Sequence, residues 1–193
     1  GTAEEAERLF NNPDLWHPLR GFQAIARDGL IPATRALYEI IERHRADDLV
    51  VAAHSMALGA QLAHEKLAIP TVSLHLQPTL IRSRIAPSKM GVAIPRWAPL
   101  WFKEWWYRYM DREVIDPALA APINAIRADV GLPPVERLFN EWIHTTSRVV
   151  ALFPEWYAPM EADWPQHTTL VGFPLYELGQ EAALPEEVER FLD

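Results

Sequence analysis

The first long pattern along the chain is that of an amphipathic helix. Between Gly21 and His44, apolar residues recur every three or four positions, as they do on one face of an α-helix. Gly29 and Pro32 lie inside this stretch, and proline removes a backbone hydrogen bond from a helix interior. We therefore predict a helix that is bent or interrupted near these two residues.

The pattern then changes to short, continuous apolar runs. Residues 49–53 and 71–76 form two such runs, and a run of this length without polar alternation is typical of a strand buried on both faces. Helical spacing from Met56 to Leu67 separates them, and Pro70 ends the connection. Strand, helix and strand at this spacing predict a βαβ unit, in which the two strands are parallel.

The rest of the chain continues the alternation of helices and strands. After a proline-rich loop region, the sequence predicts two helices and then two strands, at 97–112, 117–130, 147–153 and 168–172. The expected fold class is therefore α/β, a Rossmann-like and mainly parallel sheet flanked by helices.

Composition narrows the classes of function. The 193 residues suit one domain, and 49% of them are hydrophobic. The net charge of -8 argues against nucleic-acid binding and against strong attachment to an anionic membrane. The absence of cysteine excludes a disulfide framework and a cysteine nucleophile. No histidine spacing suits zinc, so no metal is expected, and no 18-residue apolar run predicts a transmembrane segment.

The turn after the first predicted strand offers the first candidate chemistry. In α/β proteins, ligands bind where parallel strands end, and here that point carries His54 and Ser55. A serine between strand and helix is the position of the nucleophile in α/β hydrolases, and Ala53 and Ala57 partly meet the need for small neighbours. The alternatives are that both residues line a pocket without attacking a substrate, or that Ser55 caps the helix.

Six stretches of the chain resemble bacterial glycosyltransferases of the UDP-glycosyltransferase family, particularly rhamnosyltransferase and sterol-glucosyltransferase-like members. They are residues 49–72, Leu74-His75-Leu76-Gln77-Pro78, Arg82-Ser83, Leu152-Phe153-Pro154-Glu155-Trp156, Asp163-Trp164-Pro165 and Gly172-Phe173-Pro174-Leu175-Tyr176. The resemblance implies a GT-B fold, in which an N-terminal domain binds the acceptor and a C-terminal domain binds a nucleotide sugar.

The resemblance also implies that this chain is the N-terminal domain alone. The family's catalytic histidine follows a first strand that this sequence lacks, so the catalytic base is unknown here. An aspartate that orients this histidine in many relatives corresponds to a position near Ala53. On this interpretation, residues 1–183 are an acceptor domain without its first strand, and residues 184–193 begin the connection to a missing donor domain. The isolated chain is then expected to be inactive and prone to self-association.

The resemblance directs attention to the loops that would line the acceptor site. Its expected acceptor-binding residues are His54, Ser55, His75, Gln77, Trp97 and Trp101. The acceptor is expected to be an apolar or lipid-like molecule with a hydroxyl group. No cofactor is expected besides the donor substrate, and the location is expected to be cytoplasmic, with a peripheral membrane association left open.

Trp97 and Trp101 belong to an unusually aromatic segment. They continue with Trp105 and Tyr109 at spacings of four, which places them on one stripe of a helix. Phe102, Trp106 and Met110 form an adjoining stripe. One interpretation packs one of the two stripes on the sheet, and two others place the helix along an acceptor groove or on a membrane. Two alternatives to the glycosyltransferase remain at this point: a serine hydrolase that uses Ser55, and a stand-alone binding domain without enzymatic activity.

Overall fold

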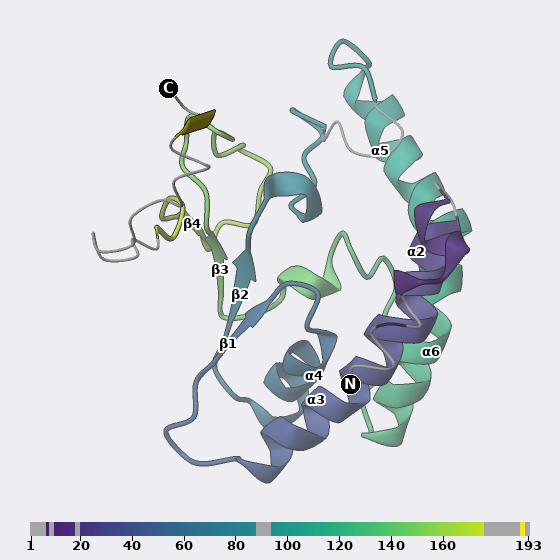
Figure 1. Ribbon diagram of the computed structural model, residues 1–193, viewed down its shortest axis with the longest axis vertical. Coiled ribbons are helices and arrows are strands. Elements are labelled where there is room, and N and C mark those ends of the chain that lie inside the picture. The colour runs from purple at the N-terminus through teal and green to yellow at the C-terminus, as the bar shows by residue number, and fades with distance from the viewer. Residues whose placement is uncertain (1–6, 8–9, 18–19, 88–93, 176–189, 192–193) are drawn as a thin grey trace.

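A four-stranded parallel sheet is the centre of the fold (Figure 1). The computed structural model describes residues 7, 10–17, 20–87, 94–175 and 190–191. The strands lie in the order β1-β2-β3-β4, with bounds β1 (Val51–His54), β2 (Thr71–His75), β3 (Arg148–Ala151) and β4 (Thr168–Leu170). The predicted α/β class and parallel sheet are therefore confirmed. The expected connection at 184–193 lies outside the described residues apart from 190–191.

Two long helical segments and one shorter helix accompany the sheet. They are the segment of α2 (Arg20–Ile25), η2 (Ala26–Leu30) and α3 (Ile31–Arg43), the helix α4 (Leu58–Leu67), and the segment of α5 (Leu100–Met110), η4 (Asp111–Ile115) and α6 (Asp116–Asp129). Three single turns complete the described elements: η1 (Pro13–Trp16), η3 (Pro78–Leu80) and η5 (Trp142–His144).

Both long segments contain a π-helical turn before a proline. The predicted disturbance near Gly29 and Pro32 is confirmed, because η2 spans Gly29 and Pro32 lies in the first turn of α3. The prediction of two separate helices at 97–112 and 117–130 is wrong, since η4 joins α5 to α6 without a break. A wider π-helical turn re-routes backbone hydrogen bonds around Pro117, so the proline bends the helix instead of ending it.

The described helices cover only one face of the sheet. Ala53, Ser73 and Val149 are register partners on that face, and the strands alternate between more buried and more exposed positions. On the opposite face, His54 and Arg148 are exposed. Burial on both faces, as predicted for the strands, is not found among the described residues. The reason is topological: strands that step in one direction through right-handed connections carry their helices on one side.

The main core fills the space between α3, α4, α6 and η5. Leu62 and Ile123 have no exposed surface, and Tyr38 of α3 is 4% exposed in the same cluster. Gly59 permits this packing, because a Cβ added there would clash with the Thr34 carbonyl oxygen of α3. A smaller core beneath β3 contains Phe153 and Trp164 among its residues.

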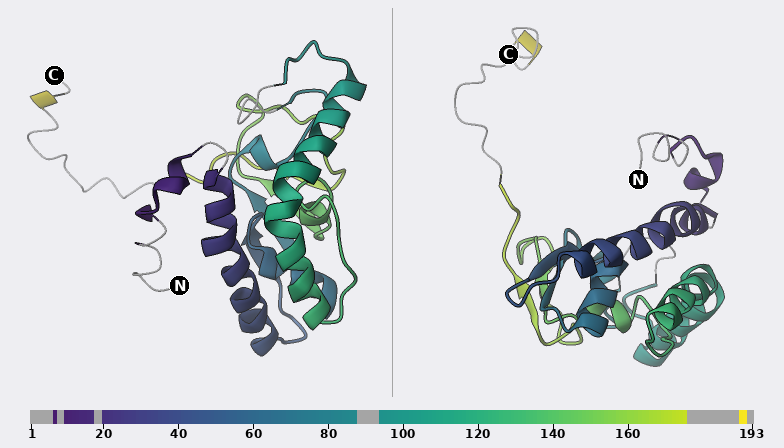
Figure 2. Two further views of the ribbon diagram at one scale, coloured as in Figure 1. Left: turned by 90° about the vertical axis from the view of Figure 1, so that its right-hand side faces the viewer. Right: turned by 90° about the horizontal axis from the view of Figure 1, so that it is seen from below.

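No helix in the described part of the chain has the length and apolar character needed to cross a membrane. The helices lie on one side of the sheet, with α5 and α6 farthest from it (Figure 2). The N-terminal half of the second long segment, α5, extends beyond the carboxyl edge of the strands (Figure 1).

Candidate functional site

Two of the expected acceptor-binding residues lie exposed where neighbouring strands end. His54 is the last residue of β1, and its Nδ1 accepts a hydrogen bond from the backbone N–H of Met56 at 3.2 Å. Gln77 follows β2 and precedes η3, and the side chain makes no capping hydrogen bond there. Because β1 and β2 are parallel neighbours, His54 and Gln77 lie at the same edge of the sheet.

Ser55, which was expected to line the acceptor site, is buried. It is 7% exposed, and its Oγ has no hydrogen-bond partner among the described residues. The N-cap position of α4 is Ala57, so the structure does not place Ser55 in the capping role that the sequence left open. The crevice beside it holds about 10 Å³, which is room for about one water molecule and no larger ligand.

His75 is also buried, and it stacks on a second histidine. The ring of His75 is 1% exposed and lies 5.5 Å from the ring of His144, with a 26° angle between the planes. Its Nε2 lies 3.2 Å from Ser73 Oγ. Burial lowers the pKa of His75 to about 3 and that of His144 to about 4, so both rings are neutral at physiological pH. The sequence predicted that His75 would line the acceptor site, but its side chain is buried.

The two tryptophans of the expected set are also largely exposed. Trp97 is 85% exposed and precedes α5, and Trp101 in its first turn is 72% exposed. This stripe therefore does not pack on the sheet, whereas Phe102, Trp106 and Met110 of the adjoining stripe are half-buried. The structure brings His54 and Gln77 together at the strand ends, while Trp97 and Trp101 lie on the outside of α5.

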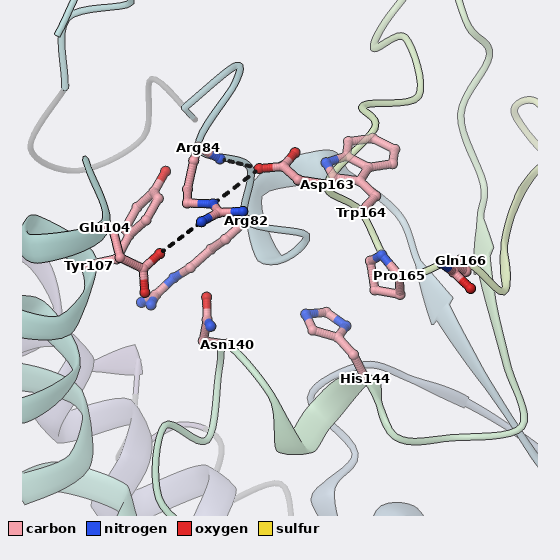
Figure 3. A pocket seen from close by; sticks show the side chains of 10 residues that line it. All are labelled: Arg82, Arg84, Glu104, Tyr107, Asn140, His144, Asp163, Trp164, Pro165 and Gln166. Atoms are coloured by element: carbon pink, nitrogen blue, oxygen red, sulfur yellow. Dashed lines mark hydrogen bonds and ion pairs between the residues drawn. The ribbon is translucent and has the colours of Figure 1, made fainter. Parts of the chain in front are cut away.

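A polar pocket of about 460 Å³ lies between α5, η5 and the segment before β4 (Figure 3). Its walls are formed by ten residues: Arg82, Arg84, Glu104, Tyr107, Asn140, His144, Asp163, Trp164, Pro165 and Gln166. Asn140 and His144 point into a space that Arg82 and Arg84 border on the other side (Figure 3). Two arginines and two carboxylates leave these walls with no net charge, because His144 is neutral.

Hydrogen bonds hold the upper wall of this pocket in place. Asp163 accepts from Ser83 Oγ at 2.8 Å and from the backbone N–H of Arg84 at 2.7 Å. Tyr107 of α5 donates its hydroxyl to the Ser83 carbonyl oxygen at 3.1 Å. These bonds fix the loop after β2 against both α5 and the segment before β4.

Arg84 is the least constrained charged group of the pocket. Its guanidinium lies 3.7 Å from Asp163 and 3.8 Å from Glu104, and it is half exposed. Arg82, by contrast, forms a short ion pair with the buried carboxylate of Asp111 and lies 5.1 Å from the centre of the Tyr107 ring. A polar ligand can therefore recruit Arg84 at little cost, whereas Arg82 is committed to the fold.

A second, more open depression lies at the opposite end of α4. It measures about 720 Å³ and is bordered by Glu65, Trp142 and Glu136, among other residues. Glu65 there is bonded to the fully buried guanidinium of Arg127 and to the indole N–H of Trp142. This end of the fold faces away from the carboxyl edge of the strands, where α/β proteins bind ligands.

Sequence reasoning had singled out parts of the pocket without joining them. Arg82-Ser83 and Asp163-Trp164-Pro165 stood out as separate stretches, and nothing in the sequence placed them side by side. Their common place depends on contacts between residues about 80 positions apart, such as Ser83 and Asp163. Among the described residues, no group of three or more histidine, cysteine, aspartate or glutamate side chains is arranged to hold a metal ion.

Comparison with known proteins does not assign this chain to a family. A scan against protein-family models and a search of curated proteins both returned no match to this chain. The fold is an α/β parallel sheet of Rossmann-like type, and the function is inferred from the sequence and the site.

Proposed function

We propose that this chain is the acceptor-binding half of a glycosyltransferase that transfers a sugar from a nucleotide sugar to a hydroxyl group. The observation that carries the proposal is the convergence of two stretches that resemble the UDP-glycosyltransferase family. Arg82-Ser83 and Asp163-Trp164-Pro165 lie far apart in the sequence, yet they are hydrogen-bonded to each other and line one pocket. If the resemblance of these two stretches to the family were accidental, they would not be expected to lie in contact.

The chemistry of the pocket suits a neutral, hydroxyl-bearing molecule. Its walls combine carboxylate, amide, guanidinium and phenol groups, which can both donate and accept hydrogen bonds, and they carry no net charge. The catalytic base and the donor-sugar contacts are not assigned to any residue of this chain. In the proposed enzyme they come from the first-strand loop and the second domain that the resemblance implies.

The geometry of Ser55 argues against the serine hydrolase. A nucleophile elbow holds its serine exposed on a strained turn and hydrogen-bonded to a histidine. Ser55 is buried, its Oγ has no partner, and positive φ among described non-glycine residues occurs only at Ala68 and Arg137. A hydrolase would still be detected by cleavage of short-chain esters that Ser55→Ala abolishes.

The direct test is transfer by the protein expressed from its full reading frame. We expect one nucleotide sugar in a panel to be consumed with a hydroxylated acceptor, and mass spectrometry to find the glycosylated product. Asp163→Asn should raise the acceptor KM by roughly tenfold, because it loosens the wall that Ser83 and Arg84 complete. Glu136→Gln, at the second depression, is the matched control and should leave KM unchanged.

The proposal fails if no nucleotide sugar is consumed with any acceptor. It also fails if Asp163→Asn and Glu136→Gln change the acceptor KM to the same extent, because the pocket would then have no special role.

A further inference from the structure

The outer surface of α5 is aromatic, while its one fully buried residue, Lys103, is charged, which reverses the usual arrangement of a surface helix. The exposed aromatic residues are Trp97, Trp101, Trp105 and Tyr109, and Leu100 lies exposed among them. We define these five residues as the aromatic face. An apolar stripe normally faces the core, so an aromatic face turned to solvent indicates a surface that is buried against something else.

The charges of this segment are sorted by the fold. Lys103 and Asp111 are 2% and 1% exposed, so both point inward. Lys103 donates to the Arg96 carbonyl oxygen at 2.8 Å, and Asp111 pairs with Arg82. Neither of these inward charges is available to a partner that approaches the aromatic face.

The charges left on the outer side are predominantly basic. Arg96, Arg108 and Arg112 are exposed along the segment. Two carboxylates accompany them: Glu104, which is one-quarter exposed and bonded to Arg108, and Glu113, which pairs with Arg112 at 3.4 Å. The outer side of the segment therefore holds three basic and two acidic side chains, in a chain whose net charge is -8. The fold thus leaves a small excess of basic side chains on this surface of an acidic molecule.

A helix that rests on a membrane surface typically carries tryptophan and tyrosine beside arginine. Indole and phenol rings are apolar with one polar group, which suits the boundary between lipid head groups and acyl chains. Arginine side chains at the same depth bind anionic head groups. The helix is also reachable, because α5 belongs to the outermost layer and extends beyond the strands (Figures 1 and 2).

We propose that α5 docks this protein onto an anionic phospholipid surface, with the aromatic face inserted at the head groups and Arg96, Arg108 and Arg112 bound to lipid phosphates. The inference does not rest on the proposed sugar transfer. It follows from the exposure of the aromatic face and the sign of the charges beside it.

The test is cosedimentation of the protein with vesicles. Vesicles of phosphatidylcholine with one part in four phosphatidylglycerol are compared with vesicles of phosphatidylcholine alone. We expect binding to the anionic vesicles that weakens with salt, together with a blue shift of tryptophan emission. The double variants Trp101→Ser/Trp105→Ser and Arg96→Glu/Arg112→Glu should each lower partitioning at least about tenfold.

Trp16→Ser is the matched control, because Trp16 is 79% exposed but lies in η1, away from α5. It should bind vesicles like the unchanged protein, and circular dichroism should show all variants folded. Equal losses in Trp16→Ser and the α5 variants would overturn the proposal. So would equal binding to both kinds of vesicle, or the absence of vesicle binding together with self-association that the α5 variants abolish, since a second copy would then cover the face.

Discussion

The helices α3 and α5 are similar in length but use their two sides in opposite ways. On α3, Tyr38 and Ile41 are buried in the main core, and Arg35 and Glu39 pair with each other in solvent. On α5, Lys103 is buried and Trp101 is exposed. The first helix is held by apolar packing and the second by hydrogen bonds and ion pairs to the loop after β2. Burial alone therefore does not explain why α5 is so aromatic, whereas the proposed contact with a lipid surface would.

The largest expected effect tests the apolar side of this comparison. Tyr38→Ala removes a side chain that is 4% exposed in the main core, together with its hydroxyl bond to Glu42. We expect the free energy of unfolding to fall by about 4 kcal/mol, because the cavity cannot close between α3 and α4. Urea denaturation measures it. Tyr38→Phe is the control and should cost no more than about 1 kcal/mol. A loss below 1 kcal/mol for Tyr38→Ala would show that α3 is not anchored as described.

The next effect tests the charged side. Asp111→Ala leaves the guanidinium of Arg82, which is 15% exposed, without its partner, and it removes the same carboxylate from Arg137 at 3.6 Å. The expected loss is about 3 kcal/mol. The double variant Asp111→Leu/Arg82→Met should recover most of it, since an apolar pair of similar volume avoids the unpaired charge. If the double variant is no more stable than Asp111→Ala, the ion pair is not what holds α5.

A pH titration tests the burial of the two stacked histidines, His75 and His144. The folded-state pKa values of about 3 for His75 and about 4 for His144 lie below the ordinary value of 6.5. Between pH 6.5 and 4 the unfolded chain therefore binds protons that the folded chain does not, so stability falls as the pH falls. From pH 7.5 to 5.5 we expect a loss of about 3 kcal/mol from the two histidines together.

The control for the titration is the variant His75→Gln, compared with His44→Gln at an exposed position. His75→Gln should flatten the slope of stability against pH in this range, and His44→Gln should leave it unchanged. An unchanged slope in His75→Gln would assign the pH dependence to other groups.

The smallest expected effect is on the aromatic face itself. Trp101→Ser removes a larger side chain than Tyr38→Ala does, yet the free energy of unfolding should change by less than about 0.5 kcal/mol. The indole is 72% exposed, so little contact is lost on replacing it. Thermal unfolding measures this value. A loss above 1 kcal/mol would mean that the aromatic face contributes to folding and is not reserved for a partner.

Local pattern was enough to place most elements of the fold. The runs that became β1 and β2, and the helical spacing between them, gave the parallel pair without any tertiary information. Their register with β3 could not be predicted, because it depends on a connection of more than 70 residues. For the same reason the pocket could not be predicted, because no sequence pattern indicates the hydrogen bond between Ser83 and Asp163.

The sequence by itself determined the fold class, the strand positions and the aromatic stripe, because these follow from the spacing of residue types along one segment. Which side of α5 faces the core was decided only in the tertiary structure. Arg82 pairs with Asp111 and the Ser83 carbonyl oxygen accepts from Tyr107, so both side chains turn inward. Lys103 turns inward to the Arg96 carbonyl oxygen, and the tryptophans were left outside. The burial of His75 was decided in the same way, when η5 folded across the sheet and placed His144 on its ring.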